Sequence, residues 1–175
     1  MKVGVFAYNF KHWKTQQGIM NLCISGFKPS VILAADPVEL KFYKSKIRVT
    51  PKDLFLWHPS DLASFYNIDY KVVRHNSEET SKIVKSYDLD IGVILGARIL
   101  NEKAFGKFKT GVVNMHPGIL PENRGLDTIK WAITKNIPQG VTTHIIDKNI
   151  DRGKVITKEK IKVYKDDTLI DLHLR

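Results

Sequence analysis

Short runs of β-branched and aliphatic residues alternate with helical patterns along most of this chain, and no other feature limits the possible folds so strongly. Buried strands are predicted at Val3–Tyr8, Val31–Ala35, Tyr70–Val73, Ile91–Leu95 and Val112–Met115. Helices are predicted at Lys14–Ser25, Pro59–Tyr66, Ser77–Tyr87 and Leu126–Thr134. Because strands that alternate with helices favour a parallel sheet, the sequence predicts an α/β, Rossmann-like fold with helices on both faces.

The pattern changes after Pro138, where two longer apolar runs follow each other without an intervening helix. Val141–Ile146 and Lys154–Val163 are predicted to extend the sheet in antiparallel fashion. Asp166, Asp167 and Thr168 resemble a helix start, so we expect a last helix from about residue 167 that is either truncated where the chain stops or unusually short. The length of 175 residues, 43% of them hydrophobic, suits one domain over residues 1–175.

Composition narrows the compartment and the class of partner. The single cysteine, Cys23, can form neither an internal disulfide nor a cysteine-based zinc site, so we expect a reducing, cytoplasmic location. The first residues lack the features of a secretory signal, and no stretch is long enough to span a bilayer, so a membrane is not an expected partner. A formal charge of +10 points to an anionic partner, which could be a nucleic acid, a phosphate-bearing metabolite, a polyglutamate tail or an acidic membrane surface. Charge alone does not choose among them.

Two basic regions keep a nucleic-acid-binding module open as an alternative. Residues 36–58 mix Lys41, Lys44, Lys46, Arg48 and Lys52 with Phe42, Tyr43, Phe55 and Trp57. Lys158, Lys160 and Lys162 recur on one face of the last predicted strand. Such segments bind nucleic acid in some proteins, but they are more often surface loops and solvated edge strands.

The segment from Val112 to Pro121 holds the polar residues that point to chemistry. Residues at i and i+2 on a strand lie on the same face, so Asn114 and His116 are predicted to emerge together at the carboxyl end of a parallel strand. Open α/β sheets place ligand sites at this edge. Taken alone, such a polar pair can simply bind its own loop, but His144 and Asp151 follow in a second cluster on another strand.

The complete pattern resembles the catalytic domain of the folate-dependent formyltransferases, the family of the glycinamide ribonucleotide, methionyl-tRNA and amino-sugar formyltransferases. The resemblance rests on Asn114-x-His116-Pro-Gly-Ile-Leu-Pro121-Glu-Asn-Arg124-Gly125, then Gly140-Val-Thr-x-His144, then Asp151-x-Gly153. It implies transfer of a formyl group from 10-formyltetrahydrofolate to an amine, with Asn114, His116 and Asp151 as catalytic residues. Two segments match the loops that hold the pterin through backbone groups: Gly96, Ala97, Arg98, Ile99 and Leu100, and Ile146, Asp147, Lys148 and Asn149, with His144 beside them.

The chemistry explains why these residue types are needed. Attack of an amine on a formyl amide places negative charge on oxygen, which preorganised donors stabilise. Asn114 and His116 can donate to that oxygen, while Asp151 can orient His116 and help to remove the proton of the amine. His144 is expected to support this group. The remaining histidines, His12, His58, His75 and His173, lack metal-ligand spacing and are expected to be structural or surface residues, so no metal is predicted.

The acceptor is predicted from the loop after the first strand. Glycinamide ribonucleotide enzymes usually carry a Gly- and Ser-rich phosphate loop there, whereas this chain has Tyr8, Phe10 and Trp13. We therefore expect a small, phosphate-bearing acceptor, an amino-sugar nucleotide, with these aromatics in contact with it. A purine-pathway formyltransferase and a formyltetrahydrofolate hydrolase remain the alternatives. Nucleic acid is not the expected partner, and a homodimer stays open.

Overall fold

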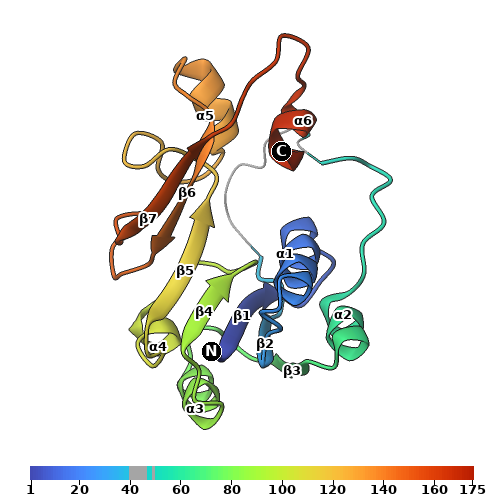
Figure 1. The fold of residues 1–175 in the computed structure, drawn as a ribbon, viewed down its shortest axis with the longest axis vertical. Helices are drawn as coiled ribbons and strands as arrows, with labels where there is room; N and C mark the ends of the chain where they lie inside the picture. Colours follow the sequence, from blue (N-terminus) through green and yellow to red (C-terminus); the bar gives the residue numbers. More distant parts are fainter. Residues whose placement is uncertain (40–46, 49) are drawn as a thin grey trace. The chain divides into compact units, whose positions relative to one another are not determined.

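The computed structural model describes residues 1–39, 47–48 and 50–175. Within them the strands form a seven-stranded sheet in the order β3-β2-β1-β4-β5-β6-β7 (Figure 1). The pairs β1-β2, β1-β4, β2-β3 and β4-β5 are parallel, whereas β6 and β7 are antiparallel. The strand bounds are β1 Val3–Tyr8, β2 Val31–Ala35, β3 Asp69–Val72, β4 Ile91–Ile94, β5 Gly111–His116, β6 Gly140–Ile145 and β7 Val155–Lys160. The predicted α/β class, with a mainly parallel sheet flanked by helices and an antiparallel C-terminal extension, is confirmed.

The chain divides into two compact units, and β5 passes from the first into the second. The first unit comprises Met1–Glu39 and Leu56–Asn114 and has β1 as its central strand. Val5 and Phe6 of β1 are completely buried between β2 and β4. The helices of this unit are α1 (Trp13–Ile24), α2 (Pro59–Tyr66), α3 (Glu78–Ser86) and α4 (Glu102–Phe105), and α1 contacts α2 while α3 contacts α4.

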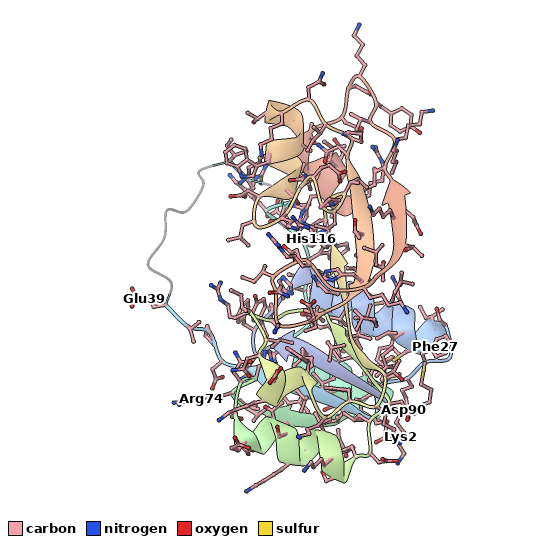
Figure 2. The ribbon with its side chains drawn as sticks, turned by 90° about the vertical axis from the view of Figure 1, so that its left-hand side faces the viewer. Lys2, Phe27, Glu39, Arg74, Asp90 and His116 are labelled. Carbon is pink, nitrogen blue, oxygen red and sulfur yellow. The ribbon has the colours of Figure 1, made fainter. Side chains whose placement is uncertain are left out.

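Local capping explains where two of these helices begin. Ser77 accepts a hydrogen bond from the Thr80 amide at 3.2 Å, and the acidic residues Glu78 and Glu79 follow in the first turn of α3. His58 caps α2, where Pro59 supplies the fixed φ that suits a first helical position. At the amino ends of β1 and β4, the Lys2 amide donates to Asp90 at 2.6 Å, and the two residues lie side by side in Figure 2.

The second unit comprises Leu40–Phe55 and Met115–Arg175 and contains the β6-β7 pair with α5 (Thr128–Thr134) and α6 (Leu169–Leu174). α5 and α6 are in contact. Thr168 begins α6 with a reciprocal capping box to Asp171, at the predicted position. Arg175 donates twice to the Asp167 carboxylate, and these bonds lower the Asp167 pKa to about 2. The single-domain organisation and the truncation of the last helix stay predictions.

Several local predictions need correction. β3 was predicted as a buried strand, but it is an edge strand with Asp69, Lys71 and Val72 exposed. β7 ends at Lys160, so Lys162 lies beyond the strand and its ammonium stands over the Tyr164 ring. The short helix α4 was not predicted. In the basic segment 36–58, Lys41, Phe42, Tyr43, Lys44 and Lys46 lie outside the described residues.

Over the described part of the chain, no helix is both long and apolar enough to cross a membrane.

Candidate functional site

Strand β5 carries Asn114 and His116 at its carboxyl end. Asn114 is half-buried and lies opposite Ile94 in the parallel register of β4 and β5, so it stands beside the point where the Gly96–Leu100 segment begins. His116 is the last residue of the strand (Figure 2). Only 4% of its surface is exposed. β5 therefore carries two polar residues, Asn114 and His116, at its carboxyl end, which is where the sequence predicted them.

A carboxylate from a distant part of the chain faces His116. The Asp151 Oδ1 atom lies 3.6 Å from His116 Nδ1 and 4.0 Å from His144 Nε2. The side chains are 11% exposed for Asp151 and 5% for His116. Two imidazoles thus meet one carboxylate oxygen in a largely buried setting, which strengthens their electrostatic interaction.

The backbone at Asp151 has an unusual conformation that fixes the direction of this carboxylate. Its φ is 51°, in the left-handed region that glycine favours and that aspartate and asparagine adopt more readily than other residues. Gly153 follows two residues later, where an added Cβ would overlap the Ile145 carbonyl oxygen. Only glycine fits at that position. The Asp-x-Gly spacing is therefore a requirement of the turn.

The loop after β5 holds Asp151 by its backbone and by its side chain. Arg124 Nε donates to the Asp151 carbonyl at 3.0 Å, and the Gly125 amide donates to Asp151 Oδ2 at 3.0 Å. One carboxylate oxygen is thereby anchored, while Oδ1 is left directed at the two histidines. This arrangement suits a group that orients a neighbouring histidine and accepts a proton nearby.

Buried hydroxyls fix the loop itself. Thr142 Oγ1 on β6 accepts from the Leu120 amide at 3.0 Å and donates to the Gly118 carbonyl at 2.7 Å. Thr128 at the start of α5 donates to the Pro117 carbonyl. Since Thr142 is completely buried and Thr128 nearly so, the loop that carries the Asp151 contacts is rigidly attached to β6 and α5.

His144 lies behind the carboxylate and is 1% exposed. Burial lowers the pKa of His144, and the nearby His116 adds to this effect, while the Asp151 carboxylate opposes it. The neutral ring is therefore favoured. A neutral histidine can stand beside Asp151 without cancelling its charge, which fits the supporting role predicted for it.

The Gly96–Leu100 segment, predicted to hold the pterin, is braced by two side chains in the first unit. The Tyr8 hydroxyl donates to the Ala97 carbonyl at 2.9 Å, and Asn76 Nδ2 donates to the Ile99 carbonyl at 2.8 Å. A Cβ at Gly96 would come within 2.8 Å of the Tyr8 ring. The Ile99 residue is 65% exposed even though its backbone is held in this way.

Two of the three predicted acceptor-binding aromatics, Tyr8 and Phe10, form a cluster with His12 at the end of β1. The rings of Tyr8 and Phe10 are stacked at 4.8 Å with an interplanar angle of 9°, and His12 meets Tyr8 edge-on at 5.2 Å. Burial raises the pKa of Tyr8, and the charge of Arg98 opposes this shift. Trp13 begins α1 directly after the cluster, and Phe10 is 36% exposed.

The second predicted pterin segment, Ile146–Asn149, links β6 to the turn that carries Asp151. Ile146 is half-buried and the other three residues are exposed. The Asn149 amide donates to Asp147 Oδ1 at 2.7 Å, so the segment is shaped by a local turn. The roles of both pterin segments and the approach of Asn114 to Asp151 stay predictions.

Sequence reasoning gave no role to several residues that shape the site. Arg124 and Gly125 were part of the recognised pattern, and their contacts to Asp151 explain why they belong to it. Thr142 offered a weaker signal as a polar residue two places before His144 on a buried strand face. Asn76 had no signal, since only the folded chain brings it to Ile99.

Comparison with known proteins shows which family the sequence of this chain matches. The family model described as Formyl transferase matches residues 38–175. The chain is 33% identical over 111 residues to GDP-perosamine N-formyltransferase of Brucella melitensis, covering 62% of this chain and 43% of that protein. It is 28% identical over 149 residues to methionyl-tRNA formyltransferase of Flavobacterium psychrophilum, covering 82% of this chain and 43% of that protein. The chain therefore spans under half the length of these two relatives.

A solved structure shows the same fold. The match to glycinamide ribonucleotide transformylase 1 of Symbiobacterium toebii has a TM-score of 0.73 at 18% identity, and it covers 99% of this chain and 79% of that one. At 18% identity this similarity shows the fold alone.

Proposed function

Because the chain belongs to the formyl transferase family, we propose that it transfers a formyl group from 10-formyltetrahydrofolate to a primary amine on a sugar nucleotide. The observation that carries the proposal is the Asp151 carboxylate held 3.6 Å from the buried His116 ring at the end of β5. The family match, the Asn114-x-His116 strand end and the anchored Asp151 all support the same reaction class.

In the donor, the formyl carbon is bonded to a folate nitrogen. The amine nitrogen forms a new bond to this carbon, and the bond from the carbon to the folate nitrogen breaks. One proton passes from the amine to the folate nitrogen. Asn114 donates its amide hydrogens to the formyl oxygen as negative charge develops there. His116 donates a second hydrogen bond. Asp151 orients His116 and accepts the proton that the amine loses, then returns it.

The donor fits the chemistry of the Gly96–Leu100 segment. This stretch of backbone is fixed by Tyr8 and Asn76, while Ile99 stays largely exposed and Leu100 is buried. A rigid backbone edge next to apolar side chains suits a flat heterocycle with several donors and acceptors. We assign backbone groups of this segment and of Ile146–Asn149 to the pterin, and we assign His144 to support Asp151.

Three observations favour an amino-sugar nucleotide as the acceptor. The stacked Tyr8 and Phe10 rings offer an aromatic surface, which suits a base or a sugar ring. The Brucella relative is named for a GDP-linked amino sugar. The net charge of +10 suits the diphosphate of such an acceptor.

A formyl-transfer screen tests the function and its acceptor together. Purified protein and 10-formyltetrahydrofolate are incubated with amino-sugar nucleotides, with glycinamide ribonucleotide, with methionyl-tRNA and with water alone. We expect a formylated sugar nucleotide and loss of the product with Asp151→Asn. Donor consumption without any acceptor would instead identify a hydrolase, and salt-dependent binding of random oligonucleotides without folate binding would identify a nucleic-acid module.

A further inference from the structure

We propose that His116 meets the reacting atoms through Nδ1 alone, because the Asn123 carbonyl permanently occupies Nε2. This inference rests on the proposed function and deepens it by naming the atom through which His116 acts. It also assigns Asn123 and Gly118 as positioning residues for that atom.

The contact at Nε2 determines which ring atom carries a hydrogen. His116 Nε2 lies 2.7 Å from the Asn123 carbonyl oxygen, and the contact is buried. A carbonyl oxygen only accepts, so Nε2 must be the donor. A ring turned by 180° would place a carbon at this position and leave the buried carbonyl without this bond. The neutral ring therefore carries its hydrogen on Nε2 and its lone pair on Nδ1.

His116 Nδ1 makes no such hydrogen bond with Asp151. The separation of 3.6 Å from Asp151 Oδ1 is too long for a hydrogen bond, although it allows strong electrostatic attraction. Nδ1 can therefore take up a proton beside the carboxylate and donate it to a substrate oxygen. Nε2 cannot serve in this way without breaking a buried hydrogen bond.

A hydrogen bond of the Asn123 side chain holds this residue, and with it the carbonyl that contacts His116, in place. Its Nδ2 atom donates to the Thr128 carbonyl at 2.8 Å, and the residue is 4% exposed. Gly118 provides the space for this contact, because an added Cβ would lie 2.6 Å from the Asn123 oxygen and 3.2 Å from His116 Nε2. The Pro-Gly turn after His116 thus has a specific purpose: a side chain there would push the carbonyl away from the ring.

Nitrogen-15 NMR of the ring of His116 in the unmodified protein tests the tautomer without any substrate. We expect a hydrogen on Nε2 throughout the folded pH range and a lone pair on Nδ1 whenever the ring is neutral. A neutral ring with its hydrogen on Nδ1 would overturn the proposal. Because the measurement needs no catalysis, it succeeds or fails separately from the formyl-transfer assay.

Two amide replacements test which nitrogen acts in the reaction. The side-chain amide of His116→Asn lies near the position of Nδ1, whereas that of His116→Gln lies near the position of Nε2. We expect His116→Asn to keep a kcat at least about tenfold higher than His116→Gln, because it retains a donor on the reactive side. Equal kcat values, or a higher value for the glutamine variant, would contradict the assignment.

Gly118→Ala tests the positioning role without changing the imidazole. The added methyl should displace the Asn123 carbonyl, shift the Nε2 resonance of His116 and lower kcat, with donor KM unchanged. Gly26→Ala is the control, since nothing lies within 4 Å of its added Cβ. The φ of 80° at Gly26 strains this replacement in itself, so the control measures the effect of backbone strain away from the site. An unshifted resonance with normal kcat in Gly118→Ala would refute the positioning role.

Discussion

Asp151 combines backbone strain with an array of fixed contacts. A left-handed φ in a residue other than glycine costs about 1 kcal/mol or more. Here the conformation is maintained by Arg124, by the Gly125 amide and by the turn at Gly153. Strain that several contacts maintain is typical of functional residues, since it holds a reactive group in one direction. The same interpretation gives Arg124 a structural reason to be in the sequence pattern.

Asn114 should contribute to the transition state and little to donor binding. Asn114→Ala is expected to lower kcat by about 10²–10³-fold, because one oxyanion donor is lost as charge develops. Steady-state kinetics at saturating acceptor measure the change. Asn21→Ala, the same replacement at an exposed position of α1, is the matched control and should leave kcat unchanged. A normal turnover in the folded Asn114→Ala variant would remove Asn114 from the mechanism.

At the scale of the elements, the Gly96–Leu100 segment depends on supports from elsewhere in the first unit. Tyr8→Phe removes the hydroxyl that holds the Ala97 carbonyl and keeps the ring that stacks on Phe10. A lost hydrogen bond of about 1 kcal/mol should raise the donor KM about fivefold while kcat changes little.

Asn76→Ala should act in the same direction through the Ile99 carbonyl. Tyr66→Phe, which removes a tyrosine hydroxyl from the half-buried end of α2, is the control for Tyr8→Phe. If Tyr8→Phe and Asn76→Ala both keep a normal donor KM, these two bonds do not shape a donor site, and the assignment of this segment to the pterin fails.

The elements that sequence predicted well are those governed by local forces. β1 and β2 begin and end where their apolar runs do, and α3 begins where Ser77 can cap it. β3 was misjudged because burial depends on the position of a strand in the sheet, and β3 lies at the edge. The contacts from Tyr8 to Ala97 and from Arg124 to Asp151 join residues 89 and 27 positions apart, and such pairing needs the whole fold.

At the scale of the whole molecule, buried histidines couple stability to pH. Burial lowers the pKa values of His144 and His75 below the ordinary 6.5, so the unfolded chain binds protons that the folded chain does not. The free energy of unfolding should therefore be at its full value above pH 6.5 and decrease as the pH falls. Urea denaturation at several pH values between 5 and 8 measures this slope.

His144→Asn identifies the contribution of one ring. The variant should be less stable than the unmodified protein. The difference in its unfolding free energy between pH 7.5 and pH 5.5 should nevertheless be smaller than in the unmodified protein, because one proton-binding group has been removed. An unchanged or steeper pH slope would show that His144 is not held neutral in the folded state.

The kcat for formyl transfer by Asp151→Asn is the most direct test of the account, since the replacement keeps the shape of the side chain and removes its charge. The account predicts that kcat falls by at least about 10²-fold, with the fold intact by circular dichroism and with tetrahydrofolate binding unchanged by calorimetry. A folded Asp151→Asn variant that transfers the formyl group at the normal rate would contradict the central claim that the Asp151–His116 pair drives the reaction.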